Sequence, residues 1–592
     1  MGLRLSALPH WLDNLKKTNE ISFVAAQLRS LSDWITETTA IRHRIVWAIF
    51  GLYTCGVIGV HLHFLYHSQP FLPSIIVEQI LEENGARNFV ERGFWKNGFL
   101  VDYSSSPNDE DHPYLYTHMP SGPTVLLGAL KKMGASILVS RTIYAMISVA
   151  GLIFLFSLIY QISGSLEIAL LAYVMATLSW EGNLKFSDHY VHSFGYLAYF
   201  GSLYFFFKYL NGSQHKKYLW AYIAVLSLSF LTSFLSCIPL VVALIGIHFL
   251  CFHGNKASKK LLKIGLSVCA FWAIILFGRN CLVFGPSVAF KDFLYTLSNR
   301  IIAWPAKDDL VEFFAANKIV LWGVGKLQSE HLNNWLQSAI LDPMKDNKIV
   351  FILIGLFLLS VKYRPPGLIR SIGALAVIFL ATYAWHVIFY AQGTNYMFPP
   401  TFRMFAIGAY SAAFVLLAVM FSYILKLAKK GDANFGSTGL LATGLLIVCT
   451  SILVPNYVSA VHKERKKLWS MIAKKYEPGE LDTYSRLANL PPGTILTNID
   501  ALVVNFFTKN LTFGGCTNDA IEQKDVRLCP SSFVGEFSKS NATPQFLFLD
   551  RLFVPGYQTC RDDCLTVLFD RVRSRYQVID ESPGRWILVK LD

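Results

Sequence analysis

The chain has 592 residues, a net charge of +14, and 53% apolar and 14% aromatic residues. This apolar fraction exceeds what a soluble core needs and favours a polytopic helical membrane protein. The positive charge does not indicate nucleic-acid binding, because many Lys and Arg residues fall in short loops between apolar runs. We find no Gly-rich phosphate loop and no zinc-finger spacing in the sequence. The mixed segment 1–43 precedes the first apolar run, so no cleavable signal is expected there.

Apolar runs long enough to cross about 30 Å of hydrocarbon recur along the chain. We predict eleven spans. They are 44–66, 138–160, 164–181, 190–210, 217–234, 236–253, 260–282, 348–362, 368–390, 402–426 and 438–457. The block 217–253 can also be one long hairpin or a kinked pair, and 348–362 is short for a span.

The loop charges predict the orientation. The segment 40–44, AIRHR, precedes the first span and places the N-terminus inside. If the spans alternate, the basic segments 211–217, 253–260, 362–370 and 426–432 all fall on the inner side. An odd number of spans then leaves the C-terminal region outside.

Three regions follow from this pattern. Segment 1–43 is a cytoplasmic N-terminal segment. Segment 44–475 is a transmembrane domain with a long first outer loop, 67–137, and another outer loop, 283–347. Segment 476–592 is an extracytoplasmic α/β domain, because GTILTN, QFLFLD and RWILVKL are typical of strands and CLTVLFDRVRSRY of a helix.

The tail contains an even number of cysteines. Cys516, Cys529, Cys560 and Cys564 predict disulfides on the outer side, the alternative being four free thiols in a reducing compartment. Asn510 and Asn541 begin glycosylation sequons on the same side.

Acidic residues are dense in the first outer loop. Most are expected to be solvated, but Glu78 lies on a helix that should run along the membrane surface. A carboxylate at the rim of an outward cavity is suited to general-base catalysis. Glu82 and Glu83 follow one turn later and are alternatives for that role.

The segment YTHMPSGP predicts a fixed turn before a second surface helix. Its prolines, Pro120 and Pro123, deliver His118 and Tyr116 close to a helix N-terminus, which attracts phosphate. A turn with a surface histidine is the alternative. Arg141 and Arg403 open two later spans, where each suits either an anionic headgroup of a substrate or a lipid phosphate at the bilayer edge.

The segment 185–194, KFSDHYVHSF, lies at the outer end of the third and fourth spans. Asp188, His189 and His192 cluster there. The two histidines are spaced to bind a metal on one helical face, although an isolated pair is more often not a site. Asp188 opens a span at the outer surface, which favours a functional acid.

These motifs resemble the GT-C glycosyltransferases, the polytopic enzymes that include protein O-mannosyltransferases and lipid A aminoarabinose transferases. ARNFVERGFWKNG resembles the first surface helix of that family, YTHMPSGP its second-helix element, and FSDHYVHSF its second-loop acid. The resemblance covers about residues 44–210. The family usually carries Asp-Glu or Asp-Asp where this chain has Glu78-Gln79, and a lysine where this chain has His118.

The resemblance implies transfer of a sugar from a polyprenyl phosphate-linked donor to a lipid, glycan or protein acceptor on the outer side, with inversion. Glu78, or else Glu82 or Glu83, would activate the acceptor, and Asp188 would orient the acceptor, hold a metal or position His118. His118, Arg141, Arg403 and Tyr116 would hold the donor phosphate. A divalent metal is left open and no nucleotide cofactor is expected.

The resemblance also implies a multi-pass protein of a bacterial inner membrane, or of the endoplasmic reticulum membrane in a eukaryote. A transporter or flippase of lipid-linked sugars, or a polysaccharide polymerase or ligase, is the alternative function. The sequence shows no clear internal repeat of the kind that transporters carry.

Overall fold

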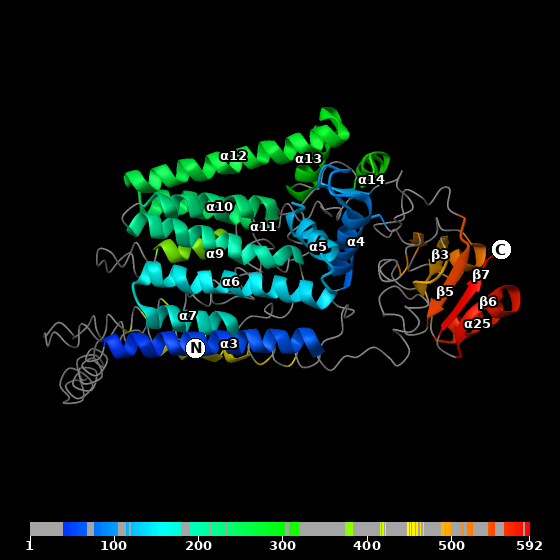
Figure 1. Cartoon of the computed structure of the whole chain (residues 1–592), viewed down its shortest axis with the longest axis horizontal. Helices are drawn as coiled ribbons and strands as arrows, with labels where there is room; N and C mark the ends of the chain where they lie inside the picture. Colours follow the sequence, from blue (N-terminus) through cyan, green and yellow to red (C-terminus); the bar gives the residue numbers. More distant parts are fainter. Residues whose placement is uncertain are drawn as a thin grey trace, which may run out of the picture.

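The computed structural model describes residues 39–67, 76–104, 114–117, 120–178, 190–212, 215–232, 234–301, 307–319 and 373–382, and parts of 415–466 and 487–591. Figure 1 shows the helices side by side in a bundle, with a small sheet beyond one end of it.

The bundle helices match the first seven predicted spans. They are α3 (Thr39–His67), α6 (Ile137–Ser163), α7 (Leu166–Leu178), α9 (Tyr190–Asn211), α10 (Lys216–Thr232), α11 (Phe234–Gly246) with the π-helical turn η2 (Ile247–Cys251), and α12 (Lys256–Phe284). Three stretches of the described residues are long and apolar enough to cross a membrane, namely His43–Val60, Ile137–Ser163 and Lys256–Phe284. The block 217–253 forms two helices.

The later predicted spans are less fully covered. Of 368–390 the structure describes an apolar helical stretch, Gly373–Thr382, and of 402–426 and 438–457 it describes scattered helical residues. The predicted span 348–362 lies outside the described residues. The total of eleven spans therefore stays a prediction.

Local signals at both ends set the bounds of two long helices. The Ser136 hydroxyl caps α6 by accepting from the backbone N–H of Val139 at 3.3 Å, and α6 ends at Gly164 with φ +71°. The Asn255 side chain caps α12 in the same way, and α12 ends at Gly285 with φ +84°. Left-handed glycines of this kind stop a helix because they lack a Cβ.

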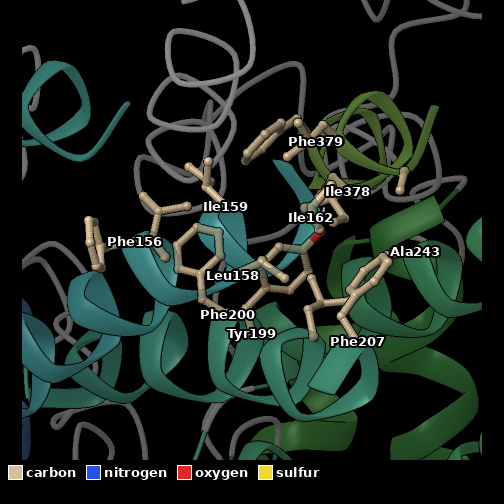
Figure 2. Close-up of a cluster of buried hydrophobic side chains, with 14 of the residues drawn as sticks. Phe156, Leu158, Ile159, Ile162, Tyr199, Phe200, Phe207, Ala243, Ile378 and Phe379 are labelled. Atoms are coloured by element: carbon tan, nitrogen blue, oxygen red, sulfur yellow. Dashed lines mark hydrogen bonds between the residues drawn. The ribbon is translucent and has the colours of Figure 1, made fainter. Parts of the chain in front are cut away.

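The bundle core is aromatic and tightly packed. Figure 2 shows Tyr199 and Phe200 of α9 between side chains of α6, α11 and Gly373–Thr382. The Tyr199 hydroxyl donates to the carbonyl of Ile378, which satisfies a buried polar group. A Cβ on Gly151 of α6 would lie 2.6 Å from the Tyr196 Cβ of α9. Only glycine permits α6 and α9 to approach this closely.

The segments predicted to lie on the outer side gather at one end of the bundle, which is called its outer end below. They comprise α4 (Ile76–Arg92), β1 (Val101–Asp102), β2 (Leu115–Tyr116), α5 (Gly122–Lys132), α13 (Pro286–Ile301) and α14 (Lys307–Ala316). Figure 1 places them at the end opposite the start of α3 and of α12. Lys and Arg residues flank both of those starts, as predicted for the inner side.

The tail forms a five-stranded sheet in the order β4-β3-β5-β7-β6. Its elements are β3 (Thr494–Thr497), β4 (Leu511–Phe513), α24 (Asn518–Gln523), β5 (Phe546–Asp550), α25 (Asp562–Arg575), β6 (Gln577–Ser582) and β7 (Trp586–Lys590). β3 pairs parallel with β4 and β5, whereas β7 pairs antiparallel with β5 and β6. The predicted strands and helix of this segment coincide with β3, β5, β7 and α25.

Apolar clusters cover both faces of this sheet, and every residue of the central strand β5 is buried. A strand buried on both faces reads as a continuous apolar run, as FLFLD does. The described residues do not include Cys516, Cys529 and Cys560, nor the side chain of Cys564. Asn510 and Asn541, the sequon asparagines, also lie outside them. The predicted disulfides therefore stay a prediction.

Candidate active site at the outer end of the bundle

The first outer loop folds into a compact unit in which α4 lies against α5 and the β1–β2 ribbon. A Cβ on Gly85 of α4 would lie 2.4 Å from Val101 Cγ1 of the ribbon. A Cβ on Gly128 of α5 would lie 3.1 Å from Phe89 Cβ of α4. The two glycines therefore allow the helices and the ribbon to meet at backbone distance.

Glu82 ties the three parts of this unit together. Its side chain is 5% exposed. The Tyr103 hydroxyl donates to Glu82 Oε1 at 2.7 Å, and the Thr124 hydroxyl of α5 donates to the other oxygen. A buried carboxylate is stable when both oxygens accept hydrogen bonds. Glu82 is thus a cross-link between α4, the ribbon and α5.

Glu83 makes a second link between the helices. It is 1% exposed and forms an ion pair with Lys131 in the last turn of α5. The Lys131 side chain keeps part of its surface exposed, so the pair lies at the edge of the unit. The partner of Glu83 is therefore a lysine at the C-terminal end of α5, where the helix dipole favours a cation.

A third buried carboxylate, Asp102, organises the ribbon. It forms an ion pair with Arg92 at the end of α4, and both side chains are 3% exposed. The backbone N–H groups of Ser104 and Tyr114 each donate to Asp102 Oδ1 at 2.9 Å. The Asn88 amide donates to the carbonyls of Asp102 and Ser104 at 2.7 and 2.9 Å. Sequence reasoning treated Asp102 as one loop acid among many and missed this role.

Positive charge lies close to the N-terminus of α5. Arg279, in the last turns of α12, is half-buried and donates to the hydroxyl of Ser121 at 3.3 Å. Ser121 directly precedes α5, and its own side chain makes no capping bond to that helix. A Cβ on Gly98 would lie 3.7 Å from the Arg279 Cγ, so the turn after α4 closes over the same arginine.

Two more arginines are withdrawn from solvent on α6 and α4. Arg141 lies near the start of α6 and is 4% exposed, which does not fit an arginine that contacts lipid phosphates at an open bilayer edge. Burial lowers the pKa of the Arg87 guanidinium, while the nearby Glu91 acts in the opposite direction. Buried or half-buried arginines of this kind are suited to anion recognition.

Sequence reasoning missed Arg279, although a signal was present. An arginine that interrupts the apolar run of 260–282 near its outer end is costly in a membrane unless it has a partner or a function. The prediction concentrated on arginines that open spans and did not consider one that ends a span.

The structure describes some of the predicted site residues and not others. Glu82, Glu83, Tyr116 and Arg141 are described and all four are buried. Glu78 lies on α4 and His192 on α9, but their side chains are outside the described residues. His118, Asp188, His189 and Arg403 lie wholly outside them.

The described part of the chain contains no group of three or more His, Cys, Asp or Glu side chains placed to hold a metal ion. The predicted metal ligands Asp188, His189 and His192 fall outside the side chains searched. The metal prediction therefore remains as the sequence left it.

No family model and no curated protein matches the chain. Solved structures do match it. The oligosaccharyltransferase AglB from Archaeoglobus fulgidus, in complex with an inhibitory peptide and a dolichol-phosphate, is 9% identical with a TM-score of 0.47, and the match covers 85% of this chain and 70% of that chain. ArnT from Cupriavidus metallidurans bound to undecaprenyl phosphate is 12% identical with a TM-score of 0.49, over 91% of this chain and 98% of that chain. In the apo state ArnT scores 0.39 at 10% identity, over 93% and 98% of the two chains.

These solved structures are GT-C enzymes, the superfamily that the sequence resembles. All the TM-scores lie below 0.5, and the function of this chain is inferred from its own residues.

Proposed function

We propose that the chain is an integral membrane glycosyltransferase that takes a sugar from a polyprenyl phosphate-linked donor and transfers it to an acceptor on the outer side. The observation that carries the proposal is Arg279 beside Ser121, directly before the N-terminus of α5. A guanidinium and a helix N-terminus at one place form an anion site. The adjoining apolar bundle suits an anion with a long lipid tail.

The donor phosphate is the leaving group in such a transfer. As the sugar–oxygen bond breaks, negative charge develops on the phosphate, and fixed cations lower the barrier by stabilising that charge. Arg279 would make this contact, with Arg141 adding positive charge from the start of α6. His118 and Tyr116, which precede α5 in the sequence, and Arg403 would complete the phosphate site.

The carboxylates would divide into two roles. Glu82 and Glu83 are engaged with Tyr103, Thr124 and Lys131, so they would hold the site in shape. Glu78 precedes Glu82 by four residues on α4, so it lies on the same face of the helix, one turn nearer the start. It would act as the base that takes a proton from the acceptor, and Asp188 would orient the acceptor.

The reaction would be a direct displacement at the anomeric carbon. The acceptor oxygen or nitrogen forms the new bond as its proton passes to the base, and the bond to the phosphate oxygen breaks with inversion. The acceptor class, whether lipid, glycan or protein, is set by surfaces beyond this charge arrangement. The protein would act in a bacterial inner membrane or the membrane of the endoplasmic reticulum.

A binding experiment tests the anion site first. Purified full-length chain in lipid nanodiscs is titrated with a polyprenyl phosphate, for wild type and for Arg279→Gln. Loss of a charge-assisted hydrogen bond of about 1.5–3 kcal/mol predicts affinity lower by roughly 10- to 100-fold. The matched control is Arg571→Gln, which removes an exposed arginine of α25 and should leave the affinity unchanged. Equal affinities for wild type and Arg279→Gln would contradict the proposed phosphate site.

A transfer experiment then tests the chemistry. The same protein is given a panel of polyprenyl phosphate sugars and acceptors, with Glu78→Gln, Glu82→Gln, Glu83→Gln and Asp188→Asn compared with wild type. Glu78→Gln should abolish turnover while donor binding persists. Turnover that survives in all four variants is incompatible with the proposed base and acceptor residues. Donor binding without turnover by wild type across the panel favours a transporter of lipid-linked sugars.

A further inference from the structure

Helix α13 (Pro286–Ile301) shows reverse amphipathicity: it exposes large apolar side chains and buries polar ones, unlike a helix on a water-exposed loop. Its buried positions include Asp292 and Asn299, which are 3% and 5% exposed. Phe290 and Phe293 are 54% and 52% exposed, and Leu294 is also exposed. A surface helix in water buries its apolar stripe and exposes its polar one. An exposed face of this composition is better suited to contact with lipid than with water.

The exposed residues Phe290, Phe293 and Leu294 form what we call the α13 apolar face. This face continues onto α12, because the rings of Phe293 and Phe277 meet edge to face with centroids 6.3 Å apart. Figure 1 shows α12 at the margin of the bundle, with α13 at its outer end.

The surface of α12 that faces away from the bundle is itself apolar and exposed. Phe271, Ile274 and Ile275 lie on it, inside the stretch Lys256–Phe284 that is long and apolar enough to cross a membrane. In a membrane-spanning helix such a surface contacts lipid tails. The α13 apolar face is an extension of that lipid-facing surface beyond the end of the span.

We propose that α13 is a shallow membrane-inserted helix whose apolar face lies among the lipid chains of the outer leaflet. The occupant of this face is bilayer lipid. Gly285, with φ +84°, turns the chain back at the end of α12, so α13 starts at the membrane boundary. Within the predicted outer loop 283–347, α13 would thus lie at the membrane rather than in water.

Flanking residues fit this depth. Lys291 lies between the two phenylalanines in sequence and is exposed, so its long side chain can extend to the headgroups while its stem lies along the helix. Trp95 is 81% exposed on the turn that follows α4, and that turn packs on α12 through Gly98 and Val283. Tryptophan is enriched at the membrane–water interface.

The inner side of α13 carries polar groups beside apolar ones, since Asp292 and Asn299 are buried there together with Ala289, and Tyr295 packs against the apolar cluster of Leu310, Phe314 and Ile319. Thr296 donates to Asp292 Oδ1 at 3.4 Å along this side, and Asn299 continues it two turns from Asp292. One short helix would thereby separate lipid from the interior at the outer end of the bundle. This inference concerns contact with bulk lipid and does not depend on the proposed transferase activity.

The test places a photoreactive benzophenone amino acid at chosen positions of the full-length chain in lipid nanodiscs. The test positions are Phe290 and Phe293. Ile274, exposed on the predicted span, shows that lipid adducts form. Val567 on α25 is the matched control, because it is 50% exposed, like the test positions, but lies on a helix of the tail segment. Each variant is first required to elute as wild type in size-exclusion chromatography.

After illumination the intact protein is weighed by mass spectrometry. The proposal expects phospholipid adducts at positions 290 and 293 in yields comparable to that at position 274, and no phospholipid adduct at position 567. The proposal would be overturned if position 274 captures lipid while positions 290 and 293 cross-link to a second copy of the chain, cross-link to the tail, or form no adduct.

Discussion

The ion pair between Arg92 and Asp102 gives the sharpest stability prediction, and Asp102→Asn is the substitution that tests it. Asparagine keeps an Oδ1 acceptor for the N–H groups of Ser104 and Tyr114, so the ribbon geometry is retained. What disappears is the negative charge beside Arg92. Because both side chains are 3% exposed, the guanidinium is left buried beside a neutral amide.

The expected cost follows from burial. Removing one partner of a buried ion pair costs about 3–5 kcal/mol, because the remaining charge stays desolvated. Arg92 retains its hydrogen bond to the Ser104 hydroxyl at 3.0 Å, which favours the lower end of this range. Asp102→Ala should cost more, since it also deprives two backbone N–H groups of their acceptor, at about 1–3 kcal/mol each.

Hydrogen exchange is the appropriate assay, because a large membrane protein does not unfold in two states. With about 1.36 kcal/mol per factor of ten, a loss of about 3 kcal/mol accelerates amide exchange in α4 and the ribbon by roughly 100-fold. The control is Glu522→Gln, which breaks the exposed pair with Arg571 and should cost about 0–1 kcal/mol. Indistinguishable exchange of α4 in Asp102→Asn and wild type would refute the reasoning.

Two further predictions concern the same unit. Gly85→Ala would place a Cβ 2.4 Å from Val101 Cγ1 and should destabilise α4 by about 1–3 kcal/mol. The control Gly51→Ala, whose Cβ would have nothing within 4 Å, should be neutral or stabilise α3 by up to about 1 kcal/mol. Thermal unfolding in detergent compares the two variants, and equal midpoints would be inconsistent with close packing at Gly85. Lys131→Met leaves the 1% exposed Glu83 without its cation and should raise the exchange rate of α5, an effect that Lys131→Arg should largely rescue if charge is what matters.

The sequence predicts the bundle helices well because apolar length is decided locally. A run such as 137–163 must be helical in a membrane, since its backbone groups have no other partners there. With Ser136 and Gly164 as its caps, α6 begins one residue before the predicted span 138–160 and ends three residues after it. The outer surface helices are also predicted, because their patterns of charge and turn residues are local.

The site is less predictable because its contacts are distant in sequence. Thr124 meets Glu82 across 42 residues, and Arg279 meets Ser121 across 158. Nothing in the segment around Glu82 distinguishes a carboxylate that two hydroxyls hold from one that is free to act as a base. The prediction of Glu82 or Glu83 as alternative bases thus rested on position along α4 and could not weigh their partners.

The reverse amphipathicity of α13 shows a different limit. In the sequence, Phe290 and Phe293 separated by Asp292 are consistent with a helix that buries its phenylalanines. The direction in which α13 turns depends on Gly285 and on packing against α12, which no pattern within α13 encodes. Which face of such a helix is exposed becomes known only when the positions of the neighbouring helices are known.

The start of α5 links the fold to the charge arrangement. A Cβ on Gly122 would lie 2.2 Å from the carbonyl oxygen of Leu231, so the first residue of α5 must be glycine for the helix to abut the end of α10. Pro123 then fixes the helical backbone at a position where no N–H is needed. Ser121, Gly122 and Pro123 therefore hold the N-terminus of α5 in one place. Arg279 reaches that place from α12, so the proposed anion site would require three segments of the chain and would form only in the assembled bundle.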